Sequence, residues 1–201
     1  WSSDVCSSDL QFQARTGGAF DVAVGTGPFK LEAEQRTVSF PLAATRLDLG
    51  AIGKGYGLDK SSVILRRFGV NHALLHGGTS SVIALDGSWP VDIRNPEGDD
   101  RPPVGRLVLR EQAMSCSSTR HAGQYASDLI DPQTEKPLTG TVGCAVLAES
   151  AAEAEVLSTA ILVMGRARAT CYLGEQARPG VMAAWIELDR KSTRLNSSHR
   201  T

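Results

Sequence analysis

The sequence predicts an α+β fold in which a largely antiparallel sheet packs against helices. Strand-like segments outnumber helical ones along the 201 residues. An Asp-Gly turn pair at 86–87 separates two strand-like runs, 81–85 and 89–93, which is typical of a β-hairpin. Helical spacing is clear in two stretches, 54–68 and 151–164. Hairpin-linked strands with few helices favour an α+β fold with antiparallel pairing.

The remaining elements follow in order along the chain. A turn at 17–20 leads to a short element at 20–24. Further segments have strand character and are bounded by turn residues, at 37–42, 46–49, 72–76, 107–109, 141–148 and 181–188. A polar loop is expected at 95–104, and residues 113–118 are expected to lead into a loop.

The second helical stretch, 151–164, has signals at both ends. Ser150 is expected to cap its first turn, with Glu153 three residues later as the capping-box partner. Gly165 is expected to end it, because glycine is favoured just past a helix C-terminus.

The composition excludes several classes of function. The net charge is −1 and aromatic residues make up 5%, which gives no reason to expect a nucleic-acid partner. No apolar run approaches the length of a membrane span. Cys116, Cys144 and Cys171 lack the Cys-x-x-Cys spacing of a zinc site, so buried free thiols are expected.

The two ends of the sequence differ from the rest. Residues 1–10 (WSSDVCSSDL) and 191–201 (KSTRLNSSHRT) are polar, lack an apolar period and resemble translated sequencing-adapter sequence. We therefore expect an incomplete natural domain at 11–190, flanked by two foreign segments. An export signal or a first structural element is then expected to be missing, so that membrane association would depend on a missing N-terminus.

A glycine-rich run, DLGAIGKGYGLDK, occupies residues 48–60 at the start of the first helical stretch. Glycines let backbone N–H groups approach a ligand, and a lysine among them suits phosphate oxygens. The helix N-terminus adds positive potential at the same place. The run matches neither of the two common nucleotide fingerprints. Phosphate binding and a tight strand-to-helix packing turn both remain open for it.

Seven short motifs occur along the chain in a fixed order. They are GAFDVAVG at 18–25, the glycine-rich run at 48–60, ALLHGG at 73–78, IRNP at 93–96, SCSS at 115–118, LIDPQT at 129–134 and AEVLSTA at 154–160. Together they resemble the ApbE family of FAD:protein FMN transferases, from about residue 17 to residue 188.

The resemblance implies an ApbE-like (T-fold-like) domain that binds FAD in a cleft, with Mg²⁺ at the pyrophosphate. Family members transfer FMN through a phosphoester bond to a Thr or Ser hydroxyl of a partner flavoprotein, and AMP leaves. Some members instead hydrolyse FAD to FMN and AMP. Many are exported, which implies a periplasmic or cell-envelope location.

The resemblance also assigns roles to residues. Metal ligands are expected at Glu155 and Thr159, four residues apart on one helical face, joined by the backbone carbonyl of Ala51. Lys54 and Asp128 are expected to act in catalysis. The nucleotide-binding residues are expected to lie in three of the motifs, at Asp48, Gly50, Gly53, Lys54, Gly55, Gly77, Gly78 and Asp131.

The chain departs from the family pattern at several motif positions. Glu155 stands where the family has Asp, and Asp128 stands where a His is frequent, so Asp128 would have to replace it as a base. Other departures lie at the edges of motifs, at Gly53, Thr79, Ser118 and Glu135. Three hypotheses follow: an FMN transferase, an FAD-binding protein without catalysis, and an FAD pyrophosphatase.

The roles of a few other residues can be interpreted in more than one way. Asp131 precedes a proline, so a turn competes with a site role. Asp21 is expected to cap or orient a backbone turn, and Asp59 to lie on a solvated helix face. His121 is the one histidine placed to replace the missing family His. Trp89 is expected to lie in the hairpin core, with stacking on a flavin as the alternative.

Overall fold

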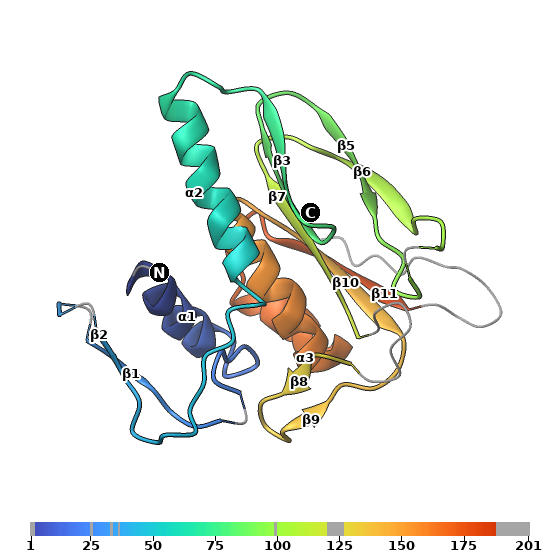
Figure 1. The fold of residues 1–201 in the computed structure, drawn as a ribbon. Helices are drawn as coiled ribbons and strands as arrows, with labels where there is room; N and C mark the ends of the chain where they lie inside the picture. The colour runs from blue at the N-terminus through green and yellow to red at the C-terminus, as the bar shows by residue number, and fades with distance from the viewer. Residues whose placement is uncertain are drawn as a thin grey trace.

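The computed structural model describes residues 3–24, 26–32, 34–35, 37–98, 100–119 and 127–187. A five-stranded antiparallel sheet lies at the centre, with strand order β11-β10-β7-β4-β3. Its strands are β3 (Ala73–Gly77), β4 (Ser81–Leu85), β7 (Ala113–Ser118), β10 (Val142–Ala148) and β11 (Met182–Glu187). Every pairing in it is antiparallel (Figure 1), so the α+β prediction is confirmed.

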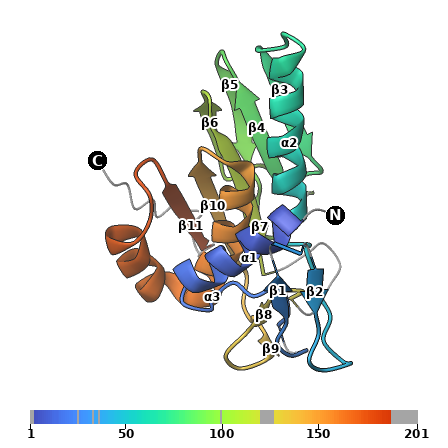
Figure 2. The same ribbon diagram turned by 90° about the vertical axis from the view of Figure 1, so that its left-hand side faces the viewer.

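Three two-stranded ribbons accompany the central sheet. They are β1 (Lys30–Glu32) with β2 (Thr37–Ser39), β5 (Trp89–Ile93) with β6 (Gly105–Leu109), and β8 (Ile130–Asp131) with β9 (Lys136–Pro137). The first and last of these lie at the same end of the molecule (Figures 1 and 2).

The predicted hairpin between 81–85 and 89–93 is wrong in its pairing. The turn exists, with positive φ at both Asp86 and Gly87. However, β4 pairs with β3 and β7, and β5 pairs with β6. All five residues of β4 are buried, so this strand is central and has neighbours on both edges. The strand that follows it must therefore leave the sheet.

Some local strand predictions also differ from the structure. Residues 113–118 form the full strand β7 instead of leading into a loop. Residues 46–49 are not a strand, and residues 20–24 form turns where they are described. These short segments have weak local patterns, and their state depends on distant partners.

The two predicted helices are present as α2 (Gly53–Arg67) and α3 (Ala151–Glu175). The cap prediction is confirmed, because the Ser150 side chain accepts a hydrogen bond from the Glu153 N–H. The predicted end at Gly165 is confirmed for the first helical segment, because α3 consists of two helical segments that meet at a kink there. Gly165 leaves the helical conformation with φ 71°, but the chain then resumes the helix to Glu175. Its continuation is held by burial of Ala169 and Tyr172 in the core.

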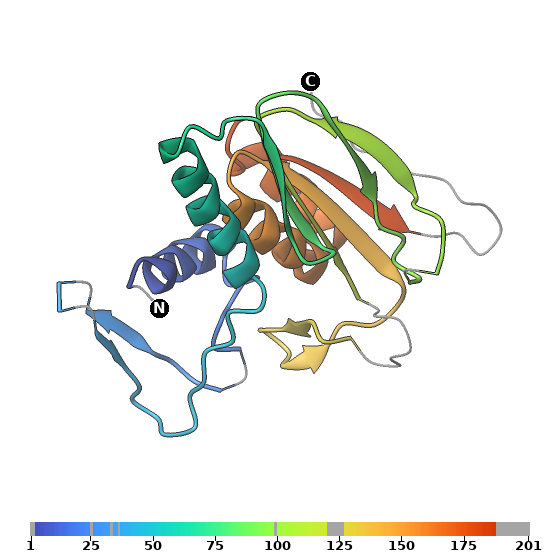
Figure 3. The same cartoon turned by 45° about the horizontal axis from the view of Figure 1, so that its top comes forward.

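The helices and the β5–β6 ribbon cover opposite faces of the central sheet (Figure 3). On the helix side, the largest buried cluster includes Ile52, Val156, Leu157 and Ile161. On the other side, a second cluster joins β5 and β6 to the sheet, with Val91, Leu109 and Met114 among its members. The sheet is thus the middle of three layers.

A further helix, α1 (Ser3–Arg15), packs on the helix side and runs through most of the segment expected to be foreign (Figure 2). Phe12 from this helix enters the main core. The Asp9 side chain is 1% exposed, and neither of its oxygens accepts a hydrogen bond from a described group. The boundaries at 1–10, 11–190 and 191–201 stay predictions.

Within the described part of the chain, none of the helices combines the length and apolar character that crossing a membrane requires.

Candidate functional site

Helices α2 and α3 pack closely against each other at Gly55. A Cβ at this position would lie 2.7 Å from Ala152 Cα, which is closer than atoms can pack. Glycine is therefore required at this position so that the two helices can pack closely. Tight packing was one of the two roles that the sequence left open for the glycine-rich run. The contact brings the first turn of α2 against the first turns of α3.

Asp59, one turn further along α2, also holds the two helices together. The prediction that Asp59 lies on a solvated helix face is therefore wrong. Its carboxylate accepts hydrogen bonds from Ser150 Oγ (2.7 Å), the Ala151 N–H (2.8 Å) and the Ala152 N–H (3.0 Å). A negative charge at a helix N-terminus is favourable for both hydrogen bonding and the helix dipole. Asp59 therefore ties α2 to the start of α3.

Glu155 is a buried charged residue of this helix pair, with 3% of its surface exposed. Its Oε2 accepts a hydrogen bond from the Gly55 N–H at 2.5 Å. Its Oε1 forms an ion pair with Lys54 Nζ and accepts no hydrogen bond from another described group. Lys54 Nζ also donates to the carbonyl of Gly50 at 2.8 Å. A buried carboxylate needs such partners, because desolvation otherwise disfavours its charged form.

The glycine turn before α2 is held by Asp48. Asp48 Oδ1 accepts from the Gly50 N–H at 2.8 Å, which closes an Asx-type turn. The Asp48 N–H donates to the Val22 carbonyl at 2.8 Å, so the turn is anchored to the 18–25 motif. Fully buried Ile52 fixes its end at the helix start. Asp48 thus orients the loop through contacts within the protein, and its predicted contact with the nucleotide stays a prediction.

The turn after β3 lies against the first turn of α2. A Cβ on Gly77 would lie 3.3 Å from Lys54 Cβ and 3.2 Å from a Leu58 methyl carbon. Gly78 follows with φ 71° in the turn itself. The structure therefore brings the glycine-rich run, the Gly77–Gly78 motif and the Glu155 motif together around Lys54.

A row of buried and half-buried hydroxyl groups connects β7 to the Glu155 helix. Ser117 Oγ lies 2.7 Å from Ser158 Oγ and 3.4 Å from Thr159 Oγ1. Ser158 Oγ donates to the Glu155 carbonyl at 2.9 Å and contacts Ser115 Oγ at 3.4 Å. Sequence reasoning missed this row, although serines at alternate positions of a strand share one face.

The donor set at Glu155 fits a hard, oxygen-preferring cation in its chemistry. One carboxylate oxygen faces only an ammonium group, and the Thr159 hydroxyl follows one helical turn later. Ala51 lies in the turn whose neighbouring Gly50 carbonyl already receives Lys54 Nζ. The described residues contain no cluster of three or more His, Cys, Asp or Glu side chains around a metal position. The ligand roles of Ala51, Glu155 and Thr159 stay predictions.

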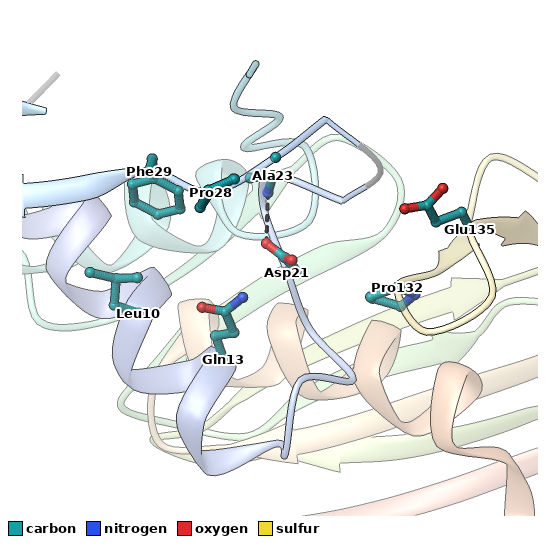
Figure 4. A pocket seen from close by; sticks show the side chains of 9 residues that line it. Leu10, Gln13, Asp21, Ala23, Pro28, Phe29, Pro132 and Glu135 are labelled. Atoms are coloured by element: carbon teal, nitrogen blue, oxygen red, sulfur yellow. Dashed lines mark hydrogen bonds between the residues drawn. The ribbon is translucent and has the colours of Figure 1, made fainter. Parts of the chain in front are cut away.

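A cavity of about 340 Å³ joins two of the motif segments at the end of the molecule that carries the ribbons. Asp21 and Pro132 line it from opposite sides, together with Phe29 and Gln13 (Figure 4). Asp21 Oδ1 accepts from the Ala23 N–H at 2.8 Å, in agreement with its expected orienting role. Neither Lys54 nor Glu155 lines this cavity.

The residues around 128–135 divide between turn and site roles. Asp131 accepts hydrogen bonds from the Gln133 N–H (2.9 Å) and Thr134 Oγ1 (3.1 Å), as its turn reading requires. Glu135 has φ 55°, which explains why glycine suits that position. Asp128 is exposed two residues before β8, and its catalytic role stays a prediction. His121 lies outside the described residues.

Several of the residues predicted to bind the nucleotide are glycines, and the structure shows the hydrogen-bond partners of some of their backbone N–H groups. The N–H groups of Gly50 and Gly55 donate to Asp48 and Glu155 respectively, so each has an internal partner. Gly53 is the first residue of α2, where the following N–H groups lack intrahelical acceptors. Contacts of any of these residues with a nucleotide remain predictions.

Comparison with known proteins identifies relatives. A sequence model of the ApbE family matches residues 26–185. The FAD:protein FMN transferase of Rhodobacter capsulatus is 35% identical over 138 residues, which cover 64% of this chain and 26% of the relative. That of Treponema pallidum (strain Nichols) is 29% identical over 173 residues, covering 77% of this chain and 47% of the relative. The chain thus spans half or less of the length of these two relatives.

Solved structures share the fold at lower identity. The ApbE protein of Thermotoga maritima superposes with a TM-score of 0.81 at 21% identity, covering 98% of this chain and 75% of that one. The flavin transferase ApbE of Vibrio cholerae gives a TM-score of 0.73 at 18% identity, covering 97% of this chain and 74% of that one. Both are mixed α+β matches over nearly the whole described chain.

Proposed function

Because the chain belongs to the ApbE family, we propose that it is a magnesium-dependent FAD:protein FMN transferase. In this reaction, a Thr or Ser hydroxyl of an acceptor protein attacks the FMN phosphorus of the FAD pyrophosphate. The oxygen–phosphorus bond to the AMP half breaks, AMP leaves, and the hydroxyl proton passes to a base. The acceptor flavoprotein and a periplasmic or cell-envelope location belong to the same proposal.

The observation that carries the proposal is the ion pair between exposed Lys54 and buried Glu155. A lysine at a glycine turn and a helix N-terminus is suited to pyrophosphate oxygens, which carry delocalised negative charge. The pairing with Glu155 holds the ammonium at that place, and the carbonyl of Gly50 gives it a second partner. Gly77 packs directly against Lys54, and the space at Gly78 is open, because no atom lies within 4 Å of a Cβ placed there.

The metal would be held by Glu155, Thr159 and the carbonyl of Ala51. A bound divalent cation supplies charge neutralisation at the pyrophosphate and stabilises the leaving oxygen. Ser117 of β7 contacts the hydroxyls of both Ser158 and Thr159 on α3, which restricts the Thr159 hydroxyl. On FAD binding, Lys54 would exchange part of its contact with Glu155 for the phosphates.

The rest of FAD would lie along the segments joined to the glycine turn. The Asp48–Val22 hydrogen bond connects that turn to the 18–25 motif, and Asp21 of this motif lines the cavity shown in Figure 4. We assign one end of the dinucleotide to this cavity, where Phe29 and Pro132 offer apolar contact. Exposed Asp128, close in sequence to Pro132, is the proposed base for the acceptor hydroxyl.

A second function, FAD binding without transfer, is favoured by one observation. Both Glu155 oxygens have partners in the structure, the Gly55 N–H and Lys54 Nζ, so the carboxylate is balanced without a metal. Glu155 is also one methylene longer than the family Asp, which lets it reach these partners. In that case the site would retain FAD and leave it intact.

The identity of the product separates the functions. The chain is incubated with FAD and Mg²⁺, with and without a peptide that bears an acceptor Thr, and AMP, FMN and flavinylated peptide are separated by chromatography. We expect Mg²⁺-dependent AMP release and flavin covalently attached to the peptide. Free FMN with AMP would indicate a pyrophosphatase, and FAD retained intact would indicate the binding protein. Failure to retain or cleave FAD would overturn all three.

A further inference from the structure

The two charged side chains of the candidate site come from helices that lie far apart in the sequence. Lys54 is in the first turn of α2, and Glu155 is in the second turn of α3. Their ion pair therefore depends on how the two helices are placed along and around each other. Such placement matters for chemistry, because a shift of about 1 Å in a catalytic arrangement can cost about a hundredfold in rate.

The steric contact at Gly55 limits this placement but does not fix it. A Cβ at Gly55 would lie 2.3 Å from the Ala151 carbonyl oxygen, so the contact sets how closely the helices approach. Glycine has no side chain that could prevent sliding or rotation at this distance. Directional hydrogen bonds between the helices are needed for that purpose.

Two carboxylates supply such bonds, and they do so in opposite directions. Asp59, in the second turn of α2, accepts hydrogen bonds from the start of α3, including Ser150 Oγ at 2.7 Å. Glu155, in the second turn of α3, accepts the N–H of Gly55 in the first turn of α2 at 2.5 Å. Because the two contacts lie one turn apart on each helix, together they restrict both sliding and rotation.

Asp59 has properties that no other residue of α2 provides. It is the single acidic residue in the α2 sequence, and its charge lies at the positive end of α3. The Ser150 hydroxyl that donates to Asp59 also accepts the Glu153 N–H at 3.2 Å. The cap of α3 and its connection to α2 thus share one hydroxyl group.

We propose that Asp59 is a positioning residue, which holds α2 and α3 in the register that brings Lys54 to Glu155. The assignment of this register stands on the contacts above, and its consequence for catalysis rests on the proposed function. Asp59 acts through Lys54 and Glu155 and makes no contact with the substrate.

A double-mutant cycle tests the register without reference to activity. The equilibrium constant of unfolding in urea is measured for the parent, Asp59→Ala, Lys54→Gln and the double variant. If Asp59 maintains the ion pair, Lys54→Gln has less effect in the Asp59→Ala background, and we expect a coupling of at least about threefold in the unfolding constant. Asp59→Asn keeps one acceptor oxygen, should show a smaller coupling, and replaces Asp59→Ala if that variant does not fold.

Glu111 provides the matched control, because it is a carboxylate that binds the other end of α2. It pairs with Arg66 in the last turn at 2.6 Å and accepts the Asp86 N–H. The effects of Glu111→Ala and Lys54→Gln on unfolding should be independent. Independent effects of Asp59→Ala and Lys54→Gln, or an equal coupling with Glu111→Ala, would overturn the proposal.

The rate of AMP release from FAD at saturating Mg²⁺ gives the second readout. Per molecule of folded protein, Asp59→Ala should lower this rate about a hundredfold, and Glu111→Ala should leave it unchanged. An unchanged rate in Asp59→Ala would overturn the catalytic consequence. A parent protein that releases no AMP would instead contradict the proposed function, and the double-mutant cycle would still decide the role of Asp59.

Discussion

Two buried carboxylates on the helix side of the molecule have opposite surroundings. Glu155 is 3% exposed, and its oxygens meet the Gly55 N–H and Lys54 Nζ. Asp9 is 1% exposed, and neither oxygen accepts a hydrogen bond from a described group. Burial therefore does not identify a functional acid by itself. Glu155 has polar partners from another helix, whereas Asp9 has none among the described groups. The presence of such partners, and not burial, therefore marks a candidate site.

Removal of the Glu155 charge gives the largest expected loss of stability. Glu155→Leu leaves the Gly55 N–H without its acceptor and Lys54 without its counter-charge. Loss of one member of a buried ion pair costs about 3–5 kcal/mol, and we expect the lower end because Lys54 is 42% exposed. Urea denaturation measures the change. The exposed Glu149→Leu is the control, with an expected change within about 0.5 kcal/mol. Similar losses of stability in Glu155→Leu and Glu149→Leu would contradict the claim that Glu155, unlike Asp9, is stabilised by its partners.

The opposite change is expected at Asp9. Asp9→Leu should stabilise the protein by about 1–3 kcal/mol at pH 8, because it removes a buried polar group without partners. Thermal unfolding of both proteins across a pH series measures it. A destabilising effect at pH 8 would show that Asp9 has a favourable role.

The pH dependence of this effect follows from burial, which raises the Asp9 pKa from 3.8 to about 7. Between these values the folded state holds the proton more tightly than the unfolded state. The Asp9 contribution to stability therefore falls as pH rises from about 4 to about 7. The difference in stability between Asp9→Leu and the parent should grow over this range and stay constant above it.

The smallest effect is expected in the turn at Glu135, where φ is 55°. Glu135→Gly relieves the unfavourable left-handed conformation, but glycine also gains entropy in the unfolded chain. We expect a net stabilisation of about 0.5 kcal/mol by urea denaturation. Glu175→Gly, at the end of α3 where the conformation is helical, should instead destabilise.

Local signals in the sequence predicted local structure well. Ser150 and Glu153 define the start of α3 because the cap involves neighbours in the chain. The alternative pairing of β4 and β5 could not be read from the Asp86-Gly87 turn, because it depends on β6 and β7. The same limit applies to Asp59, whose partners on α3 are more than ninety residues away.

The candidate site follows the same division. The motifs predicted that Lys54 and Glu155 belong to one site, with Lys54 in contact with the nucleotide and Glu155 in contact with the metal. Their direct pairing follows from the close approach of α2 and α3 at Gly55, which depends on tertiary packing. The contact between the serines of β7 and those of α3 depends on strand register, so the local sequence did not predict it either.

The central claim is that Lys54 binds the phosphates and Glu155 acts with the metal. The most direct test measures FAD affinity and Mg²⁺-dependent AMP release on the same samples of the parent protein, Lys54→Gln, Glu155→Gln and the control Glu149→Gln. We predict that Lys54→Gln weakens FAD binding about tenfold. Glu155→Gln should retain FAD in the absence of metal and lose AMP release by about a hundredfold. Equal losses of FAD affinity in both variants, or AMP release unchanged in Glu155→Gln, would contradict this account.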